Sequence, residues 1–102
     1  MDTSGIIANR KTATTTSSST QATALAANSE RAGFFIQNLG TNPLFVLLGS
    51  GATITNFNYI LKGGTAANDG TGASIGQNVG VVYTGVITVA GTTPTYVATE
   101  QY

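Results

Sequence analysis

Short apolar runs separated by clusters of turn-forming residues make up most of the chain after residue 20. Several of these runs alternate apolar and polar positions with a period of two, which is typical of β-strands. Clusters rich in Gly, Asn, Ser or Pro recur about every eight to twelve residues, the spacing of sandwiches and barrels. The pattern therefore predicts an all-β domain of roughly five to eight short strands and no helix.

Two continuous apolar runs carry the strongest local signal. Residues 32–37 contain two adjacent phenylalanines and an isoleucine, which predicts a central strand covered on both faces. Residues 38–42 read NLGTN and supply Gly and Asn for positive φ angles, and Pro43 marks the turn exit. Residues 44–48 form the second apolar run. We therefore expect the two runs to pair as a β-hairpin.

Weaker patterns predict the other strands and the connections between them. Residues 28–30 (NSE) indicate a turn, and residues 63–78 (GGTAANDGTGASIGQN) indicate a long loop. A loop of that length is uncommon in a small domain unless it binds something or is mobile. Further strands are expected at residues 22–27, 57–62, 79–89 (with a break at Thr84 and Gly85) and 95–100.

The N-terminal residues 1–20 differ in composition, with a Thr/Ser tract and few apolar side chains. Thr favours extended backbone, yet this segment offers little to bury. We expect an extended arm at residues 1–20, followed by a single small antiparallel β-sandwich domain at residues 21–102. The arm is either a disordered tail in the free subunit or a strand that pairs with a neighbouring chain, with Ile6 and Ile7 as its anchor.

Charged side chains are scarce. Four basic and four acidic residues make up 8% of the chain, against roughly 25% in a typical domain, and near-zero net charge favours association. We expect assembly, without a nucleic-acid partner, since that needs a basic stripe. We expect no membrane partner either, since no run of about 20 apolar residues is present.

The chain lacks the usual residues of catalysis and of metal binding. It has no His and no Cys, so the many Ser and Thr hydroxyls lack a strong base to activate them. The glycine-rich segment at residues 63–78 has neither the Lys nor the following helix of a phosphate loop. Its one acid, Asp69, is too few for the six to eight oxygens of a calcium site, and a turn at Asn68 and Asp69 explains it better. We expect no enzyme activity, no cofactor and no metal.

Two further groups of side chains have alternative interpretations. Four tyrosines could line a sugar-binding face, although scattered tyrosines are more often core or interface residues; they are Tyr59, Tyr83, Tyr96 and Tyr102. Glu30 and Arg31 would be neighbours along a strand and so point to opposite faces, which argues against a catalytic pair. A surface or interface ion role is expected, and an Arg at a strand start typically caps backbone carbonyls or pairs across subunits.

The progression from LAANSERAGFFIQNLGTNPLFVLLGSGAT through LKGG and YTGVITV to YVATEQ resembles small β-rich virion proteins of tailed bacteriophages. The resemblance covers roughly residues 20–102, and the long loop at residues 63–78 departs from it. It implies a jelly-roll β-sandwich that acts as a head decoration, cement or fibre-base protein, or as a neck or tail component, with no catalytic residues. The residues that carry it are Leu25, Asn28, Arg31, Gln37, Asn38, Gly49, Val97 and Glu100.

These observations lead us to expect a cement protein. Several copies, three in our interpretation, would pack through the sandwich edges and use the arm to grip the major capsid protein. The candidate contact residues are Ile6, Ile7, Arg10, Lys11, Glu30, Arg31, Asn68 and Asp69. The alternatives are a recognition module that displays the loop at residues 63–78 to a glycan, and, less favoured, an enzyme that uses Glu30 or Glu100.

Overall fold

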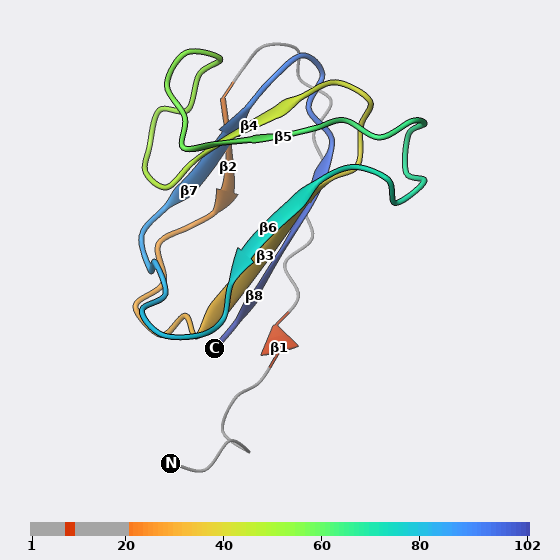
Figure 1. Cartoon of the computed structure of the whole chain (residues 1–102). Helices are drawn as coiled ribbons and strands as arrows, with labels where there is room; N and C mark the ends of the chain where they lie inside the picture. Colours follow the sequence, from red (N-terminus) through yellow and green to blue (C-terminus); the bar gives the residue numbers. More distant parts are fainter. Residues whose placement is uncertain (1–7, 10–20) are drawn as a thin grey trace.

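The computed structural model describes residues 8–9 and 21–102, which form eight strands in two antiparallel sheets (Figure 1). One sheet has the order β1-β8-β3-β6 and the other has the order β2-β7-β4-β5. The strands are β1 (Ala8–Asn9), β2 (Ala22–Leu25), β3 (Gly33–Asn38), β4 (Leu44–Leu47), β5 (Tyr59–Leu61), β6 (Ser74–Gln77), β7 (Ile87–Ala90) and β8 (Tyr96–Gln101).

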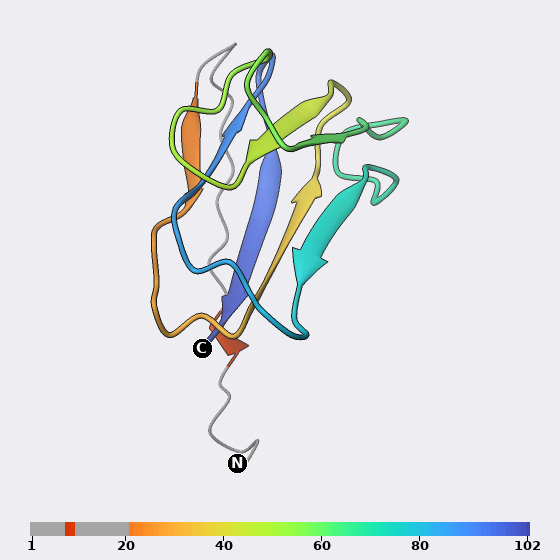
Figure 2. The ribbon, with the colours of Figure 1, turned by 60° about the vertical axis from the view of Figure 1, so that its left-hand side comes forward.

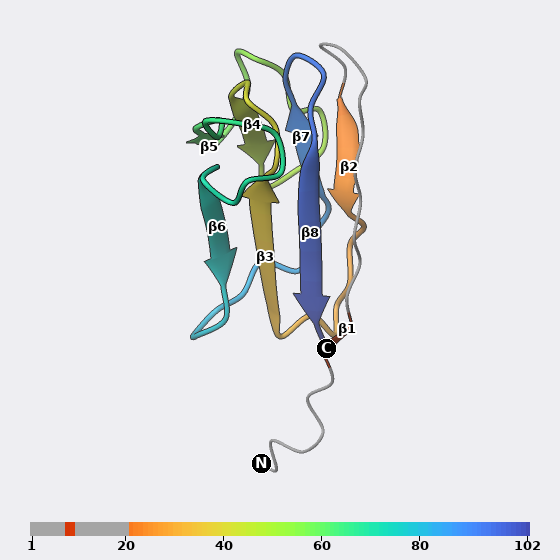
Figure 3. The ribbon, with the colours of Figure 1, turned by 90° about the vertical axis from the view of Figure 1, so that its right-hand side faces the viewer.

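The strand order is that of a jelly roll. β1 pairs with β8, β2 with β7, β3 with β6 and β4 with β5, as in one long hairpin. Folding that hairpin over brings β3 against β8 and β4 against β7, which completes the two sheets. Figures 2 and 3 show the two layers face to face. The predicted small antiparallel sandwich of jelly-roll type is therefore confirmed.

The core lies between the two sheets and is built from the inward-facing positions of the strands. In β8, for example, buried and partly buried residues alternate along the strand, as expected when one face of a sheet packs on a core. Burial of Tyr96 raises the pKa of its hydroxyl. The core residues are Ala24, Leu25, Phe34, Ile36, Leu44, Val46, Leu61, Ile87, Val89, Tyr96 and Ala98.

The predicted hairpin of residues 32–37 and 44–48 is wrong. β3 and β4 lie in different sheets, and the connection between them crosses from one layer to the other. Hydrophobicity showed that both segments are buried but not which segments they pair with. In the described part of the chain, positive φ angles occur elsewhere, for example at Asn68 and Gly70, and Gly40 does not adopt one.

β3 is central in its sheet, as predicted, but the described residues cover only one of its faces. Phe34 and Ile36 point into the core, whereas 53% of Phe35 between them is exposed. Phe35 is on the outer face because neighbouring residues of a strand point to opposite faces of the sheet. The expectation of cover on both sides is therefore wrong for the isolated chain.

The segment from residue 63 to residue 89 also differs from its prediction. The expected long loop contains a strand, β6, that pairs with β3, and residues 79–86 form a loop where a strand was expected. The sequence of β6, SIGQ, has one large apolar residue, which is enough for an edge strand held by backbone hydrogen bonds. The closing strand expected at residues 95–100 is confirmed as β8.

The short strand β1 lies inside the predicted arm. Ala8 is opposite Gln101 and Asn9 is opposite Glu100, so these two residues belong to the sheet. Residues 1–7 and 10–20 lie outside the described residues, and with them the predicted contacts at Ile6, Ile7, Arg10 and Lys11.

Candidate interaction surfaces

The Arg31 side chain is buried at one end of the sandwich and binds groups from three segments. Its Nε lies 3.0 Å from Oε1 of Glu100 on β8. Nη1 donates to the carbonyl oxygens of Tyr83 (3.0 Å) and Gly85 (2.9 Å), and Nη2 donates to that of Ala26 (2.7 Å). Arg31 therefore caps backbone carbonyls, one of the two roles expected for it. Because it is buried within the chain, it offers no surface for a subunit contact.

Glu30 points away from this buried cluster. The turn predicted at residues 28–30 is present: the Arg31 amide donates to the Asn28 carbonyl (3.0 Å), and the Glu30 amide donates to Oδ1 of Asn28 (3.0 Å). Glu30 is exposed whereas Arg31 is buried, so the two side chains are separated as expected. A contact role for Glu30 stays a prediction.

Asp69 organises the β5–β6 loop. Its carboxylate accepts bonds from the Thr65 hydroxyl and Ala66 amide on one oxygen, and from the Thr71 hydroxyl and amide on the other, at 2.6 to 3.0 Å. The hydrogen bonds from Thr65, then Thr71, lower its pKa from 3.8 to about 2. Asn68 takes the left-handed φ of 60° beside it. These bonds explain the Asn-Asp-Gly sequence as a turn, and contact roles for Asn68 and Asp69 stay predictions.

The tip of the β6–β7 loop, residues 79–81, presents two apolar side chains to solvent. Val79 is 85% exposed and Val81 is 96% exposed, and Gly80 between them has a φ of 75°. The loop lies at the end of the sandwich where β3 begins and β8 ends (Figure 1). Sequence reasoning missed this feature, because Val-Val runs favour strands and exposure follows only from the fold.

A second apolar area lies on the outer face of the β2-β7-β4-β5 sheet. The rings of Phe45 and Phe57 are in tilted contact, with centroids 5.0 Å apart. Ile60, opposite Phe45 on the neighbouring strand, is 55% exposed. Because the two rings cover part of each other, they are less exposed than the valines of the loop tip.

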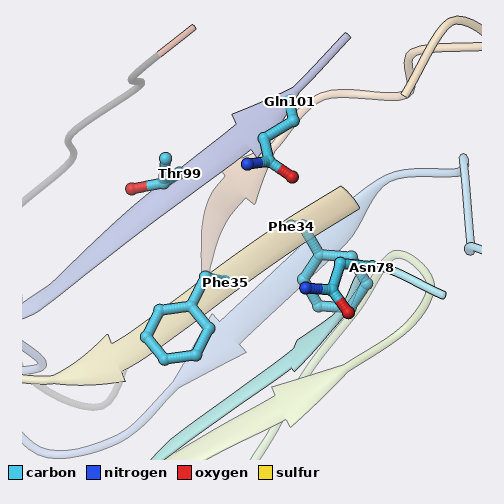
Figure 4. A pocket seen from close by; sticks show the side chains of 5 residues that line it. All are labelled: Phe34, Phe35, Asn78, Thr99 and Gln101. Atoms are coloured by element: carbon cyan, nitrogen blue, oxygen red, sulfur yellow. The ribbon is translucent and has the colours of Figure 1, made fainter. Parts of the chain in front are cut away.

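An open depression of about 210 Å³ lies on the outer side of the other sheet, beside Phe35 (Figure 4). It was not anticipated either, since Phe35 was expected to be covered. The four tyrosines do not assemble into a comparable face. Tyr96 is in the core, and the Tyr83 hydroxyl donates to the Val86 carbonyl at 3.0 Å. The residues that line the depression are Phe34, Phe35, Asn78, Thr99 and Gln101.

Comparisons with known proteins give no relative. The chain matches no protein-family model, no curated protein and no solved structure. Within residues 8–9 and 21–102, no three His, Cys, Asp or Glu side chains gather as a metal site. The same residues contain no helix that could cross a membrane.

Proposed function

We propose that the protein is a non-enzymatic virion structural subunit, a decoration or cement protein that binds the major capsid protein as a trimer and stabilises the shell. The observation that carries this proposal is the almost complete exposure of Val79 and Val81. Large apolar groups displayed together on a loop tip indicate a surface that a partner covers. The jelly-roll fold, found in viral capsid proteins among others, supports the proposal by analogy only.

Hydrogen bonds from neighbouring segments hold the base of the β6–β7 loop, and the tip at residues 79–81 projects into solvent. Arg31 binds the carbonyls of Tyr83 and Gly85, the Asn28 amide donates to the Thr84 carbonyl (2.8 Å), and Oε1 of Gln77 accepts from the Tyr83 amide (2.9 Å). A loop held in this way loses little conformational entropy on binding. The two valines are therefore presented as a preorganised contact.

Two features favour a repeating assembly. Among the described strands, none pairs with the outer edge of β5 or of β6, and an open edge is a template for pairing with another chain. The low charge of the chain opposes association only weakly. Many modest contacts on a lattice then add to tight attachment. A neck, tail or fibre-base position would use the same contacts at far fewer copies.

The double substitution Val79→Ser/Val81→Ser tests the contact. Burial of a valine is worth about 1.5 kcal/mol, so the pair contributes about 3 kcal/mol and its loss weakens capsid binding about a hundredfold. Binding is measured by co-sedimentation with capsids that lack the protein. Thermal unfolding of the variant should match that of the parent chain, because neither side chain packs on the core.

Ile60→Ser is the matched control, since Ile60 is also an exposed aliphatic residue but lies on β5 of the β2-β7-β4-β5 sheet and not in the β6–β7 loop. It should bind capsids like the parent chain. Full attachment of the double valine variant would contradict the proposed contact.

The proposed arm contact needs a separate truncation that stops at residue 7, because removal of residues 1–19 would also delete β1.

A further inference from the structure

The outer face of the β1-β8-β3-β6 sheet presents the Phe35 ring among small neighbours. Phe35 lies opposite Gly76 on β6 and Thr99 on β8. A Cβ atom at Gly76 would lie 2.7 Å from Cδ1 of Phe35 and 2.6 Å from the Phe34 carbonyl oxygen. Only glycine at this position lets the ring lie across β6. The ring is 53% exposed and lies at the depression (Figure 4).

Three polar side chains line the same depression as this ring, and their hydrogen-bonding groups are free within the described chain. The amides of Asn78 and Gln101 and the hydroxyl of Thr99 make no hydrogen bond to the described residues. Most other Asn and Gln side chains are engaged; these are Asn28, Gln37, Asn38, Asn42, Asn56, Asn58 and Gln77. The depression thus gathers unused donors and acceptors beside an aromatic ring.

A second glycine keeps the depression open. Gly33 lies opposite Gln101 on β8, and a Cβ atom there would lie 2.9 Å from Oε1 of Gln101 and 3.2 Å from Cβ of Asn78. Any side chain at this position would push the two amides apart or fill the space between them. The two amides can therefore approach one ligand from two sides.

The described part of the lining is uncharged. None of the described charged side chains borders the depression, and the nearest along the chain, Glu100, points inward to Arg31. Among the described residues, a phosphate, a carboxylate or a cationic ligand would find no opposite charge there. A large apolar protein surface would leave the free amides without partners, which is costly. A neutral ligand with both an apolar face and hydroxyl groups satisfies all of these groups.

We propose that Phe35, Asn78, Thr99 and Gln101 form a binding site for a neutral saccharide. The C–H face of a sugar ring stacks on Phe35, and its hydroxyls exchange hydrogen bonds with the two amides and the Thr99 hydroxyl. The depression is smaller than the roughly 300 to 1,000 Å³ of drug-sized pockets, so it takes one sugar ring and binds it weakly, with a millimolar Kd. The site adjoins the valine loop tip, because Asn78 directly precedes Val79, and the proposal does not depend on the proposed capsid function.

The test is a titration of the 15N-labelled full chain with maltotriose, cellotriose, chitotriose and lactose, followed by amide chemical shifts. We expect one or more of these sugars to shift the amides of Gly76, Asn78 and Gln101. Phe35→Ala should weaken that binding by about tenfold or more, equivalent to about 1.4 kcal/mol. The matched control Ile60→Ala removes an equally exposed apolar side chain from the other sheet and should bind like the parent chain.

Thr99→Val provides a second variant that keeps the shape of the side chain and removes only its hydroxyl. It should also weaken binding, and it keeps the test valid if Phe35→Ala fails to fold. The proposal is overturned if none of the sugars shifts these amides, or if the shifts survive in both variants. Loss of capsid attachment in Phe35→Ala, without any sugar binding by the parent chain, would instead assign the face to a protein partner.

Discussion

At the scale of single residues, buried polar side chains join segments that are distant in the sequence. The buried polar residues are Arg31, Asn38, Thr88 and Glu100. Each has hydrogen-bond partners, and no buried side-chain polar atom of the described residues lacks one. Thr88, for example, donates to the Gly49 carbonyl (2.7 Å) and accepts from the Ala52 amide (3.1 Å), which fastens the β4–β5 loop over β7.

Replacing Arg31 should lower the free energy of unfolding more than replacing Glu30, Gln37 or Asn38. Arg31→Met leaves Glu100 buried without its cation and leaves three backbone carbonyls without a donor, so the free energy of unfolding should fall by about 3 to 5 kcal/mol. Chemical denaturation measures this change. Glu30→Gln, at the exposed neighbouring position, should change it by no more than about 0.5 kcal/mol. Equal stability of Arg31→Met and the parent chain would refute the structural role.

The stability of the β5–β6 loop, which Asp69 organises, should depend on pH in the strongly acidic range. Because the folded pKa of about 2 lies below the usual 3.8, the carboxylate stabilises the loop above pH 3.8 and loses this effect as the pH falls towards 2. NMR titration of the Asp69 side-chain carboxyl should show a midpoint near pH 2, with the Thr65 and Thr71 amides following it. In Asp69→Asn these amides should no longer titrate. A midpoint at the ordinary value would contradict the hydrogen-bonded turn.

At the scale of secondary-structure elements, the sequence predicted which segments are buried better than it predicted how they pair. The closing strand β8 and the turn before Arg31 follow from local alternation and local turn chemistry. The partner of β3 does not, because the same apolar pattern suits a hairpin and a strand that pairs in another sheet. Exposure of the Val79 and Phe35 side chains depends on what covers them in three dimensions, so neither candidate surface could be read from local pattern.

The crossing between the two sheets after β3 depends on Asn38. Its Nδ2 donates to the carbonyls of Asn42 (2.8 Å) and Leu61 (3.0 Å), and its Oδ1 accepts from the Gly40 amide (2.9 Å). These bonds take the place of the positive-φ turn that the sequence suggested. A side chain therefore sets the path of this connection.

Asn38→Ala should lower the free energy of unfolding by about 2 kcal/mol or more, because backbone groups at the crossing lose their partners in a buried site. Thermal or chemical denaturation provides the measurement. Gln37→Ala is the control one residue earlier, where the side chain makes only longer contacts, 3.3 and 3.4 Å, to the β5–β6 loop. If the two variants lose equal stability, Asn38 has no special role in the crossing.

At the scale of the whole molecule, the two proposed binding surfaces adjoin one another, because Asn78 of the depression directly precedes Val79 of the loop tip. The valine loop tip lies at one end of the sandwich, and the Phe35 depression lies on the outer side of one sheet. The open edges of β5 and β6 remain available for subunit pairing. Under the proposed function, a subunit would attach to a lattice through the end that carries the loop tip and would pair with neighbouring subunits through these edges.

The proposed function predicts that purified virus particles contain this chain, and its most direct test is the copy number of the chain in such particles, measured by quantitative mass spectrometry against the major capsid protein. A decoration or cement protein should be present at one copy per capsid subunit or at a simple fraction of that number. A handful of copies per particle would assign it to the neck, tail or fibre base instead. Absence from the particles would contradict a virion role altogether.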